Sequence, residues 1–503
     1  MLKSIRLKNF KLHEDTLIEA APITVFIGPN NSGKSSIFQA LLALRQAALR
    51  NSAQLFQPTQ RQPTQPDQPY LFPADTSVDL GEFRDVVRPG GQEIQIMVDG
   101  NIHSQLARPR IKWGEIRFTV TVRDNLLISH HGRSQSPFGP FEWSWAAKSS
   151  SEPPRVAFNI DGFILGIGVS RDTFRLIQRF GYTYPGGVSP DLQAESVSKV
   201  EEVADFLGNA PLRLLNSLHP ILPLRGFEEW GCPIAEPPRS GLDLLSVSDR
   251  AVALTNTVAS DRRLKAALSE RLEELLGIGI DFETVLPGKR LKIWAKPVEK
   301  GLPDTLLSNE GTGANQLPFI LLPIALTPRN ETVLLSEPEA HLHPKAQCEL
   351  TRMLLTVAKK ESIQFFIETH SEHVLHVILN SIGKREWEPS QVAIYSFENV
   401  KGAARVSRLE VDEQGGVKGG LPGFFDQSLD ELTEYLETLK KPSAYDTTSC
   451  STITLSISPS VPWTATTILM ALRLASFKRS SRFAIHLSSM RSSGSGTSRY
   501  WTN

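Results

Sequence analysis

Gly28-Pro29-Asn30-Asn31-Ser32-Gly33-Lys34-Ser35-Ser36 is the stretch that decides the fold, because its glycines, lysine and serine have the spacing of a phosphate-binding loop. The apolar run Ile23–Ile27 precedes it and a helical pattern begins near Lys34, the order of strand, loop and helix that the motif requires. The two glycines allow the backbone N–H groups to turn toward a polyphosphate. Lys34 can reach the phosphates, and the Ser35 hydroxyl is a suitable ligand for Mg²⁺. The sequence therefore predicts a nucleoside-triphosphate site.

The composition is that of an ordinary globular protein. The chain has 503 residues, of which 40% are hydrophobic and 21% charged, and its formal net charge is zero. This length predicts about three or four domain-sized units. Cys232, Cys348 and Cys450 have no metal-ligand spacing, which favours a reducing compartment, and we expect a cytoplasmic protein. No apolar run reaches the roughly 18 residues of a spanning helix, so no membrane partner is expected.

Apolar periodicity predicts the elements on both sides of the loop. Residues 1–50 form the N-terminal half of the predicted nucleotide domain, with a strand over Leu2–Phe10 and another through Leu17 and Ile18. Residues 51–77 are rich in Gln and Pro and are predicted to be a flexible excursion. Residues 78–290 are interpreted as an inserted region, antiparallel strands first and helices after, including helices over 191–207 and 262–276.

Residues 291–440 are predicted to be the second half of the nucleotide domain. Residues 331–336 have the pattern of a buried strand, followed by Glu337 and Glu339. A helix over 345–360 and a buried strand over 363–368 come next, and the strand is followed by His370. In an open α/β sheet, such strand ends meet the bound nucleotide. A hairpin over 392–411 and an acidic helix over 429–439 complete this half.

The C-terminal segment, residues 441–503, differs from the rest in composition. It is rich in Ser and Thr, and from Thr447 onward it contains no Asp or Glu. One interpretation is a disordered basic tail; the favoured one is a sequence not selected as a domain, such as an altered reading frame.

Two later residues are candidates for catalysis. Glu337 can take the proton of the water that attacks the γ-phosphate, although an acid that caps the turn before Pro338 is the alternative. His370 can donate to the γ-phosphate and sense its presence, the alternative being a core histidine. His341 and His343 lack a third metal ligand of fitting spacing and are interpreted as structural.

A second anion-binding pattern lies at residues 307–316, where a serine, two glycines and polar amides precede a helix. One γ-phosphate does not need two such loops from one subunit. We therefore expect Ser308, Gly311 and Gly313 to contact the nucleotide of a second copy of the chain.

Together these motifs resemble the ATPase heads of the OLD, RecF and SMC-like branch of the ABC superfamily. Within this branch the chain looks similar to bacterial AAA-type ATPases with a DUF3696-like C-terminal part, and the likeness covers about residues 1–50 and 290–440. The stretches that carry it are Phe10-Lys11, residues 28–36, residues 308–316, Leu335-Ser336-Glu337-Pro338-Glu339-Ala340-His341-Leu342-His343-Pro344 and Glu368-Thr369-His370-Ser371-Glu372-His373.

The resemblance implies an ATP- and Mg²⁺-dependent homodimer or higher oligomer that acts on or near DNA. Such proteins often serve in DNA repair or antiviral (anti-phage) defence beside a nuclease or other effector partner. The resemblance also implies that Lys34 and Ser35 bind phosphate and Mg²⁺ and that Glu337 is the catalytic acid/base. His370 would be the switch residue, and Ser308, Gly311 and Gly313 would form a signature that acts in trans.

Ser336 departs from the pattern of these relatives, which usually have an acid before the catalytic glutamate. The serine removes a charge from the surroundings of Mg²⁺, and it is itself a weak candidate metal ligand. Hydrolysis is then slow, or Glu339 partly substitutes for the missing acid. Nothing after Ser371 offers the Asp-x-Asp pair of a Toprim nuclease, so no intrinsic nuclease is expected.

We therefore predict an α/β fold: an ABC/SMC-like P-loop NTPase head with a mixed sheet and helices, interrupted by an inserted antiparallel β region and a helical subdomain. The predicted function is ATP binding and hydrolysis coupled to dimerisation around ATP. The alternative is a nucleotide-switched scaffold with little turnover, which Ser336 favours. A small-molecule kinase would leave the second loop and His370 without a role, and a GTPase would need an Asn-Lys-x-Asp segment that the chain lacks.

Overall fold

The computed structural model describes much of the chain up to residue 420. The predicted elements at 51–77, 191–207 and 429–439 and the segment 441–503 lie outside the described residues. The described residues are 1–49, 78, 80–102, 115–123, 126–136, 139–146, 155–160, 163–168, 211, 213–223, 225–235, 247–285 and 289–420.

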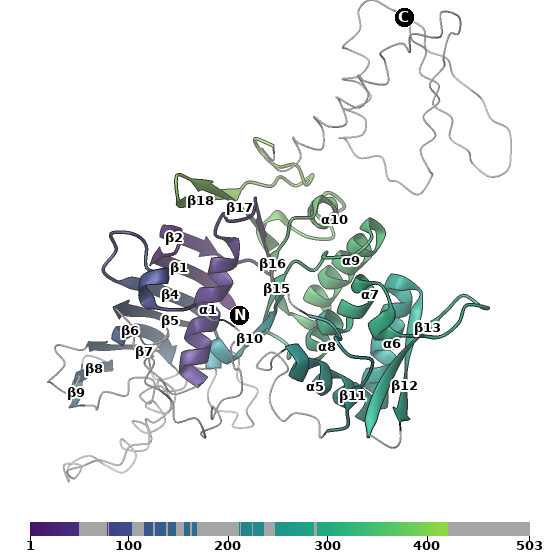
Figure 1. Ribbon diagram of the computed structural model, residues 1–503. Helices are drawn as coiled ribbons and strands as arrows, with labels where there is room; N and C mark the ends of the chain where they lie inside the picture. The colour runs from purple at the N-terminus through teal and green to yellow at the C-terminus, as the bar shows by residue number, and fades with distance from the viewer. Residues whose placement is uncertain are drawn as a thin grey trace, which may run out of the picture. The chain divides into compact units, whose positions relative to one another are not determined.

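A six-stranded sheet of order β10-β15-β16-β3-β17-β18 carries the predicted nucleotide site (Figure 1). Its first five strands are parallel, and only β18 is antiparallel to its neighbour. Every residue of β3, β15 and β16 is buried, as expected for parallel strands that are covered on both faces. The strands are β10 (Leu218–Ile221), β15 (Thr332–Ser336), β16 (Gln364–Glu368), β3 (Ile23–Ile27), β17 (Val392–Val400) and β18 (Ala403–Leu409).

An eight-stranded antiparallel sheet of order β2-β1-β4-β5-β6-β7-β8-β9 forms a second layer. The period of two in the sequence predicted five of these strands, and β6, β7 and β9 were not expected. Because β1 pairs with β4, the border predicted at residue 78 falls between strands of one sheet. The strands are β1 (Leu2–Phe10), β2 (His13–Glu19), β4 (Ile94–Asn101), β5 (Glu115–Arg123), β6 (Leu126–Ser136), β7 (Gly139–Ala146), β8 (Arg155–Ile160) and β9 (Phe163–Gly168).

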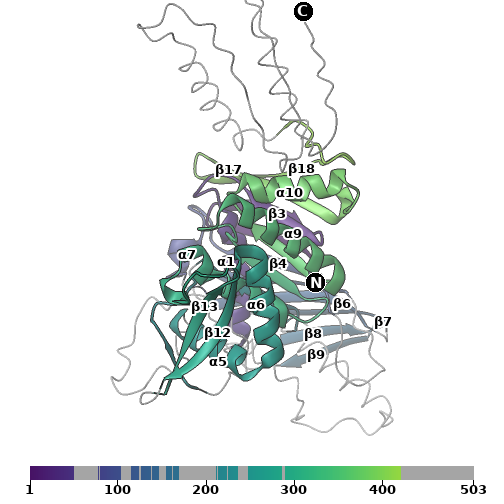
Figure 2. The same cartoon turned by 90° about the vertical axis from the view of Figure 1, so that its right-hand side faces the viewer.

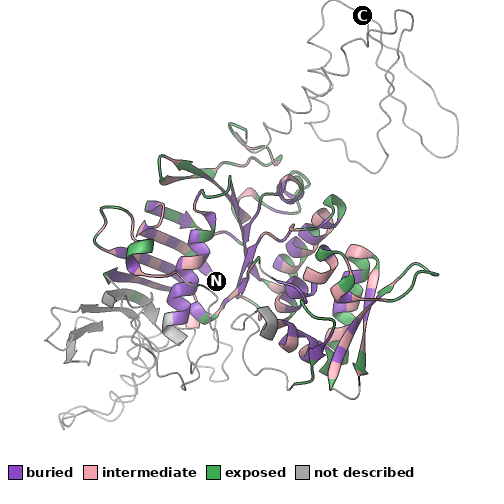
Figure 3. Ribbon diagram, viewed as in Figure 1, coloured by how far each residue is buried: buried purple, intermediate pink, exposed green. Residues whose placement is uncertain are grey.

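Helix α1 (Lys34–Leu49) packs in one hydrophobic core with both sheets, and Figure 3 shows that most of its surface is buried. Ile37 and Leu41 of α1 share this core with Ile5 of β1 and with Phe26 and Phe366, which lie on one face of the parallel sheet. This explains why the α1 sequence is apolar around most of its circumference.

The other face of the parallel sheet forms a second core with five helices. Val25 and Ile367 belong to this core, so alternate residues of β3 and β16 serve the two cores. The helices are α5 (Val247–Ser260), α6 (Arg262–Leu276), α8 (Pro318–Leu326), α9 (Pro344–Glu361) and α10 (Glu372–Gly383).

A small third sheet was not expected from the sequence. Its strands β12 (Ile278–Val285) and β13 (Arg290–Pro297) form a hairpin beside α6, as Figure 2 shows. The other strands are β11 (Cys232–Pro233) and β14 (Thr305–Leu306), and the remaining short helices are α2 (Phe83–Val86), η2 (Leu307–Asn309), α7 (Thr312–Gln316) and η3 (Pro389–Gln391).

Local signals in the sequence placed several elements correctly. Helix α6 begins after Asp261, whose side chain accepts hydrogen bonds from two backbone N–H groups, and it ends at Gly277 with φ of 72°. The predicted α/β class with a mixed sheet is confirmed, as are the strands beside the phosphate loop and the hairpin of β17 and β18. None of the described helices is long and apolar enough to span a membrane.

Gln364, at the start of β16, joins the two larger sheets through its side chain. Its Oε1 accepts hydrogen bonds from Leu2 N at 2.8 Å and from Thr332 Oγ1 at 2.8 Å. Its Nε2 donates to the carbonyl oxygens of Leu2 at 2.9 Å and Ala21 at 3.1 Å. Gln364 is 3% exposed, so water could not take over its hydrogen bonds to these backbone and hydroxyl groups if the side chain were removed.

We expect Gln364→Leu to lower the free energy of unfolding by about 3 kcal/mol, because it leaves buried backbone and hydroxyl groups without partners. Urea denaturation followed by tryptophan fluorescence measures the change. Gln414→Leu, at an exposed position, is the control and should stay within about 0.5 kcal/mol of wild type. Equal behaviour of the two variants would contradict the proposed link between the sheets.

Candidate nucleotide-binding site

The phosphate loop turns sharply at the end of β3, and glycine is required there. Gly28 has φ of 137°, and a Cβ at this position would lie 2.2 Å from the carbonyl oxygen of Phe397 in β17. Gly33 has φ of 99° and directly precedes α1. Asn399 donates through Nδ2 to the carbonyl oxygen of Asn31 at 3.0 Å. Strand β17 therefore holds the loop at two points.

Lys34 folds back over this loop. Its Nζ donates to the carbonyl oxygens of Gly28 at 3.0 Å and Pro29 at 2.8 Å, and the residue is 4% exposed. Burial lowers the pKa of Lys34, while the charges of Glu368 and the acids after β15 oppose this shift. Ser32 Oγ is buried and has no hydrogen-bond partner among the described residues. The Lys34 amine could exchange its two carbonyl acceptors for phosphate oxygens, and the Ser32 hydroxyl could donate to a further one.

The ends of three parallel strands meet beside the loop. Glu368, the last residue of β16, is in register with Ser336 of β15 and with Phe26 of β3. Ser35 Oγ donates to Glu368 Oε1 at 2.5 Å, and Ser336 Oγ donates to Glu368 Oε2 at 3.4 Å. Burial raises the pKa of Glu368, and its hydrogen bond from Ser35 and the charge of Lys34 oppose the rise. A buried carboxylate therefore lies directly beside the predicted metal ligand.

Glu337 follows β15 in a strained turn. Its φ is 46°, and its backbone N–H donates to the carbonyl oxygen of Glu368 at 2.8 Å. The Arg225 guanidinium donates to the carbonyl oxygens of Ser336 at 2.9 Å and Glu337 at 2.6 Å. Glu337 itself is half-buried, at the edge where Ser35 is exposed. The backbone of the turn is thus fixed by hydrogen bonds from Arg225 and to Glu368, and the Glu337 side chain remains partly accessible.

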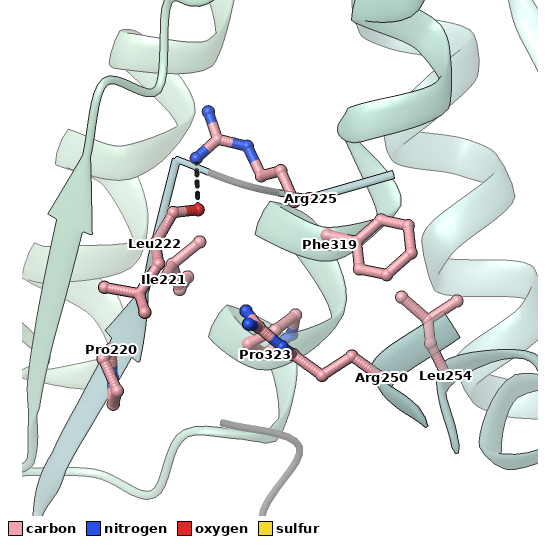
Figure 4. A pocket seen from close by; sticks show the side chains of 8 residues that line it. All are labelled: Pro220, Ile221, Leu222, Arg225, Arg250, Leu254, Phe319 and Pro323. Atoms are coloured by element: carbon pink, nitrogen blue, oxygen red, sulfur yellow. Dashed lines mark hydrogen bonds between the residues drawn. The ribbon is translucent and has the colours of Figure 1, made fainter. Parts of the chain in front are cut away.

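Arg225 belongs to the chain just after β10 and lines a pocket between β10 and α8 (Figure 4). It also donates to the carbonyl oxygen of Leu222 at 3.0 Å, the bond drawn in Figure 4. Burial lowers the pKa of Arg225 to about 10, with the charges of Glu339 and Glu337 opposing the shift. The pocket is lined by Pro220, Ile221, Leu222, Arg225, Arg250, Leu254, Phe319 and Pro323.

Glu339 and His370 connect the turns that follow β15 and β16. Glu339 Oε1 accepts a hydrogen bond from the His370 backbone N–H at 2.7 Å. Burial raises the pKa of Glu339, and the bond from His370 opposes the rise. The His370 residue is exposed, yet partial loss of hydration and the charge of Lys34 lower its pKa. The charge of Glu337 opposes this lowering of the His370 pKa.

The predicted signature in trans lies on a separate surface loop. Gly311 is exposed, Ser308 is half-buried, and Ser308 Oγ donates to its neighbour Asn309 at 3.4 Å. Gly313 is buried, and a Cβ there would lie 2.6 Å from the carbonyl oxygen of His341. Within the described residues, no hydrogen bond joins this loop to residues 28–36 of the same chain.

The histidines near Glu337 have structural surroundings. His343 precedes α9 and accepts a hydrogen bond from the Lys345 N–H through its side chain at 3.3 Å, as a residue that caps the helix does. His341 has φ of 61° in the preceding turn. No group of three or more His, Cys, Asp or Glu suited to a metal occurs in the part of the chain that the structure describes. Mg²⁺ does not need such a group, because this ion is usually bound through one or two carboxylates together with phosphate oxygens and water.

The structure brings the phosphate loop, Glu337 and His370 together, and it adds residues that sequence patterns did not assign. Glu368 had appeared as the last residue of a strand and within the stretch from Glu368 to His373, and neither Glu368 nor Arg225 had been given a role. His13 is buried, with Nε2 3.0 Å from the carbonyl oxygen of Gly33. Burial lowers the pKa of His13, against the effect of that contact. The contacts of these residues are with segments distant in the sequence, so spacing in the sequence could not assign them a role.

Comparison with known proteins finds a matching domain family. The family model described as an AAA ATPase domain matches residues 1–99 and 266–375, less than half of the chain. No curated protein matches the sequence.

Solved structures that resemble the chain include several SMC heads. The SMC head domain from Thermotoga maritima has 16% identity and a TM-score of 0.36, covering 82% of this chain and 99% of that chain. An SMC head bound to the C-winged helix domain of ScpA has 12% identity and a TM-score of 0.38, covering 82% and 98%. An Smc head with an extended coiled coil, bound to the C-terminal domain of ScpA derived from Pyrococcus furiosus, has 13% identity and a TM-score of 0.35, covering 88% and 99%.

The family match and the site geometry fall on the same residues. The two matched segments contain the phosphate loop, Ser308 to Gly313, Glu337 and His370. Residues 1–99 and 266–375 are therefore similar to an AAA ATPase domain, and they contain the phosphate-loop pattern.

Proposed function

We propose that the chain binds ATP with Mg²⁺ and hydrolyses it at the edge formed by the ends of β3, β15 and β16. The observation that carries this proposal is the contact of Ser35 Oγ with Glu368 at 2.5 Å, which ties the phosphate loop to the strand before His370. The coupling of Lys34 to Glu368, Glu337 and Glu339 supports it, because these residues are distant in the sequence.

Each residue then has a defined task. Lys34 exchanges its bonds to the Gly28 and Pro29 carbonyls for phosphate oxygens, and Ser32 Oγ gains the partner it lacks. Mg²⁺, when bound, neutralises charge that develops on the phosphates. Water attacks the γ-phosphorus, the bond to the bridging oxygen breaks to give ADP and phosphate, and Glu337 accepts the proton of the water. His370 senses the γ-phosphate.

We further propose that ATP holds two copies of the chain together, as a homodimer or within a higher oligomer. The loop with Ser308, Gly311 and Gly313 has the anion-binding design of a second phosphate contact, yet it makes no hydrogen bond to residues 28–36 of its own chain among the described residues. We therefore expect this loop to contact the phosphates of the nucleotide that is bound to the second copy of the chain.

The resemblance to OLD, RecF and SMC-like heads with a DUF3696-like part extends the proposal to a biological role. We propose a cytoplasmic protein of DNA repair or anti-phage defence that acts through a separate nuclease or other effector partner, with DNA as a further ligand. The proposed division of the chain remains 1–50 and 291–440 for the head and 78–290 for the insertion. The second candidate is a scaffold that binds ATP with little turnover, favoured by the serine at position 336.

Lys34→Ala should weaken ATP binding about tenfold or more, because a hydrogen bond to a charged group contributes about 1.5–3 kcal/mol. Isothermal titration calorimetry of the purified full chain with ATP and Mg²⁺ measures the dissociation constant. Lys300→Ala, an exposed lysine in the turn after β13, is the matched control and should bind as wild type does. Unchanged affinity of Lys34→Ala would refute the nucleotide site.

Glu337→Gln should lower the ATPase rate about a hundredfold or more, because it removes the acceptor of the proton. The variant should therefore accumulate as an ATP-bound dimer or larger assembly, measured by light scattering with and without ATP. Ser308→Arg in the same background is the control, because it blocks the signature loop and should keep the chain monomeric. A wild-type rate near zero with normal ATP binding would favour the scaffold instead.

A further inference from the structure

The charge balance around Ser35 raises a question about the metal. A Mg²⁺ ion held by a serine hydroxyl and phosphate oxygens is usually accompanied by one or two carboxylates. Strand β15 ends beside the loop in Ser336, which is 3% exposed and carries no charge. The carboxylate that a magnesium site needs must therefore come from another element.

Partial substitution by Glu339 was one of the two alternatives that Ser336 left open, but one oxygen of the Glu339 carboxylate is already used. Glu339 Oε1 accepts the His370 N–H at 2.7 Å, which fixes the turn after β16. Neither Glu339 nor Glu337 has a hydrogen bond to Ser35 in the described part of the chain. Among the described acids, Glu368 is therefore the one in hydrogen-bond contact with the hydroxyl that would bind the metal.

Glu368 meets the requirement in position and burial. It lies one strand over from Ser336, in register with it, and between β15 and β3. Both oxygens of its carboxylate accept from serines, Ser35 at 2.5 Å and Ser336 at 3.4 Å. The residue is 3% exposed, so little water solvates its charge, and Lys34 is the cation coupled to it.

We propose that Glu368 supplies the acid of the magnesium site, by accepting a hydrogen bond from the Ser35 hydroxyl so that a lone pair of Ser35 Oγ would be free for the metal. The acid that the related ATPases have at the end of β15 is then provided by the last residue of β16. A hydroxyl that donates to a carboxylate is a stronger and better oriented ligand than a free one. Glu368 is thus a positioning residue that acts through Ser35, and this inference rests on the proposed ATP site.

The test measures ATP affinity by calorimetry in Mg²⁺ and in EDTA, and reports the ratio of the two dissociation constants. Glu368→Gln keeps the size and an acceptor oxygen but removes the charge. It should reduce the gain in affinity from Mg²⁺ about tenfold or more and leave the affinity in EDTA near wild type. Glu413→Gln, at an exposed position, is the charge-matched control, and Glu339→Gln is the comparator for the other buried acid.

A second variant tests the same idea by rescue. Ser336→Asp in the Glu368→Gln background restores one carboxylate beside Ser35 and should recover most of the gain from Mg²⁺. A loss caused only by misfolding would lower the affinity in EDTA as well and would not be rescued.

The outcomes separate this inference from the proposed function. If wild type itself gains no affinity from Mg²⁺ or does not bind ATP, the proposed function fails. If wild type gains affinity but Glu368→Gln gains equally, or if Glu339→Gln alone loses the gain, the role assigned to Glu368 is overturned.

Discussion

Parallel pairing of β16 with both β15 and β3 is the constraint on which the site depends. The pairing aligns Ser336, Glu368 and Phe26 across three strands, so segments that are hundreds of residues apart in the chain end at one edge. All residues of these strands are buried, and alternate side chains serve the two hydrophobic cores. A slip of one residue would exchange the faces and separate Glu368 from Ser35, so burial itself maintains the register of the site.

Two cationic and three acidic side chains lie near this edge of the sheet, and the packing of the fold does not require them. Lys34 interacts with three carboxylates, those of Glu337, Glu339 and Glu368, and Arg225 provides a second buried cation below them. Burial raises the pKa of Glu339 and Glu368 and lowers that of Lys34. Such desolvation is costly in an isolated chain, and groups of this kind are typical of functional sites.

Sequence patterns predicted the local parts of this structure well. Gly28 to Ser36, the helix before Gly277 and the hairpin after Val392 are set by neighbours in the chain, through glycine conformations, caps and alternation. The sheet of β11 to β14 was missed because β11 and β14 are short and β12 is only partly buried, although β13 does have the alternation of a strand, with Leu291, Ile293 and Ala295 buried. The task of Glu368 and that of Arg225 could not be predicted, because both depend on contacts between strands distant in sequence.

The tight fit of Gly313 against the carbonyl of His341 has a consequence for signalling within the proposed dimer. There is no room for a side chain between the signature loop and the turn that contains Glu337. The backbone of that turn is also clamped by Arg225 and by the carbonyl of Glu368, so it cannot absorb a displacement by itself. If two copies share ATP as proposed, a displacement of the turn that contains Glu337 after phosphate release would also move the loop of Ser308, Gly311 and Gly313, which would couple the two ATP molecules.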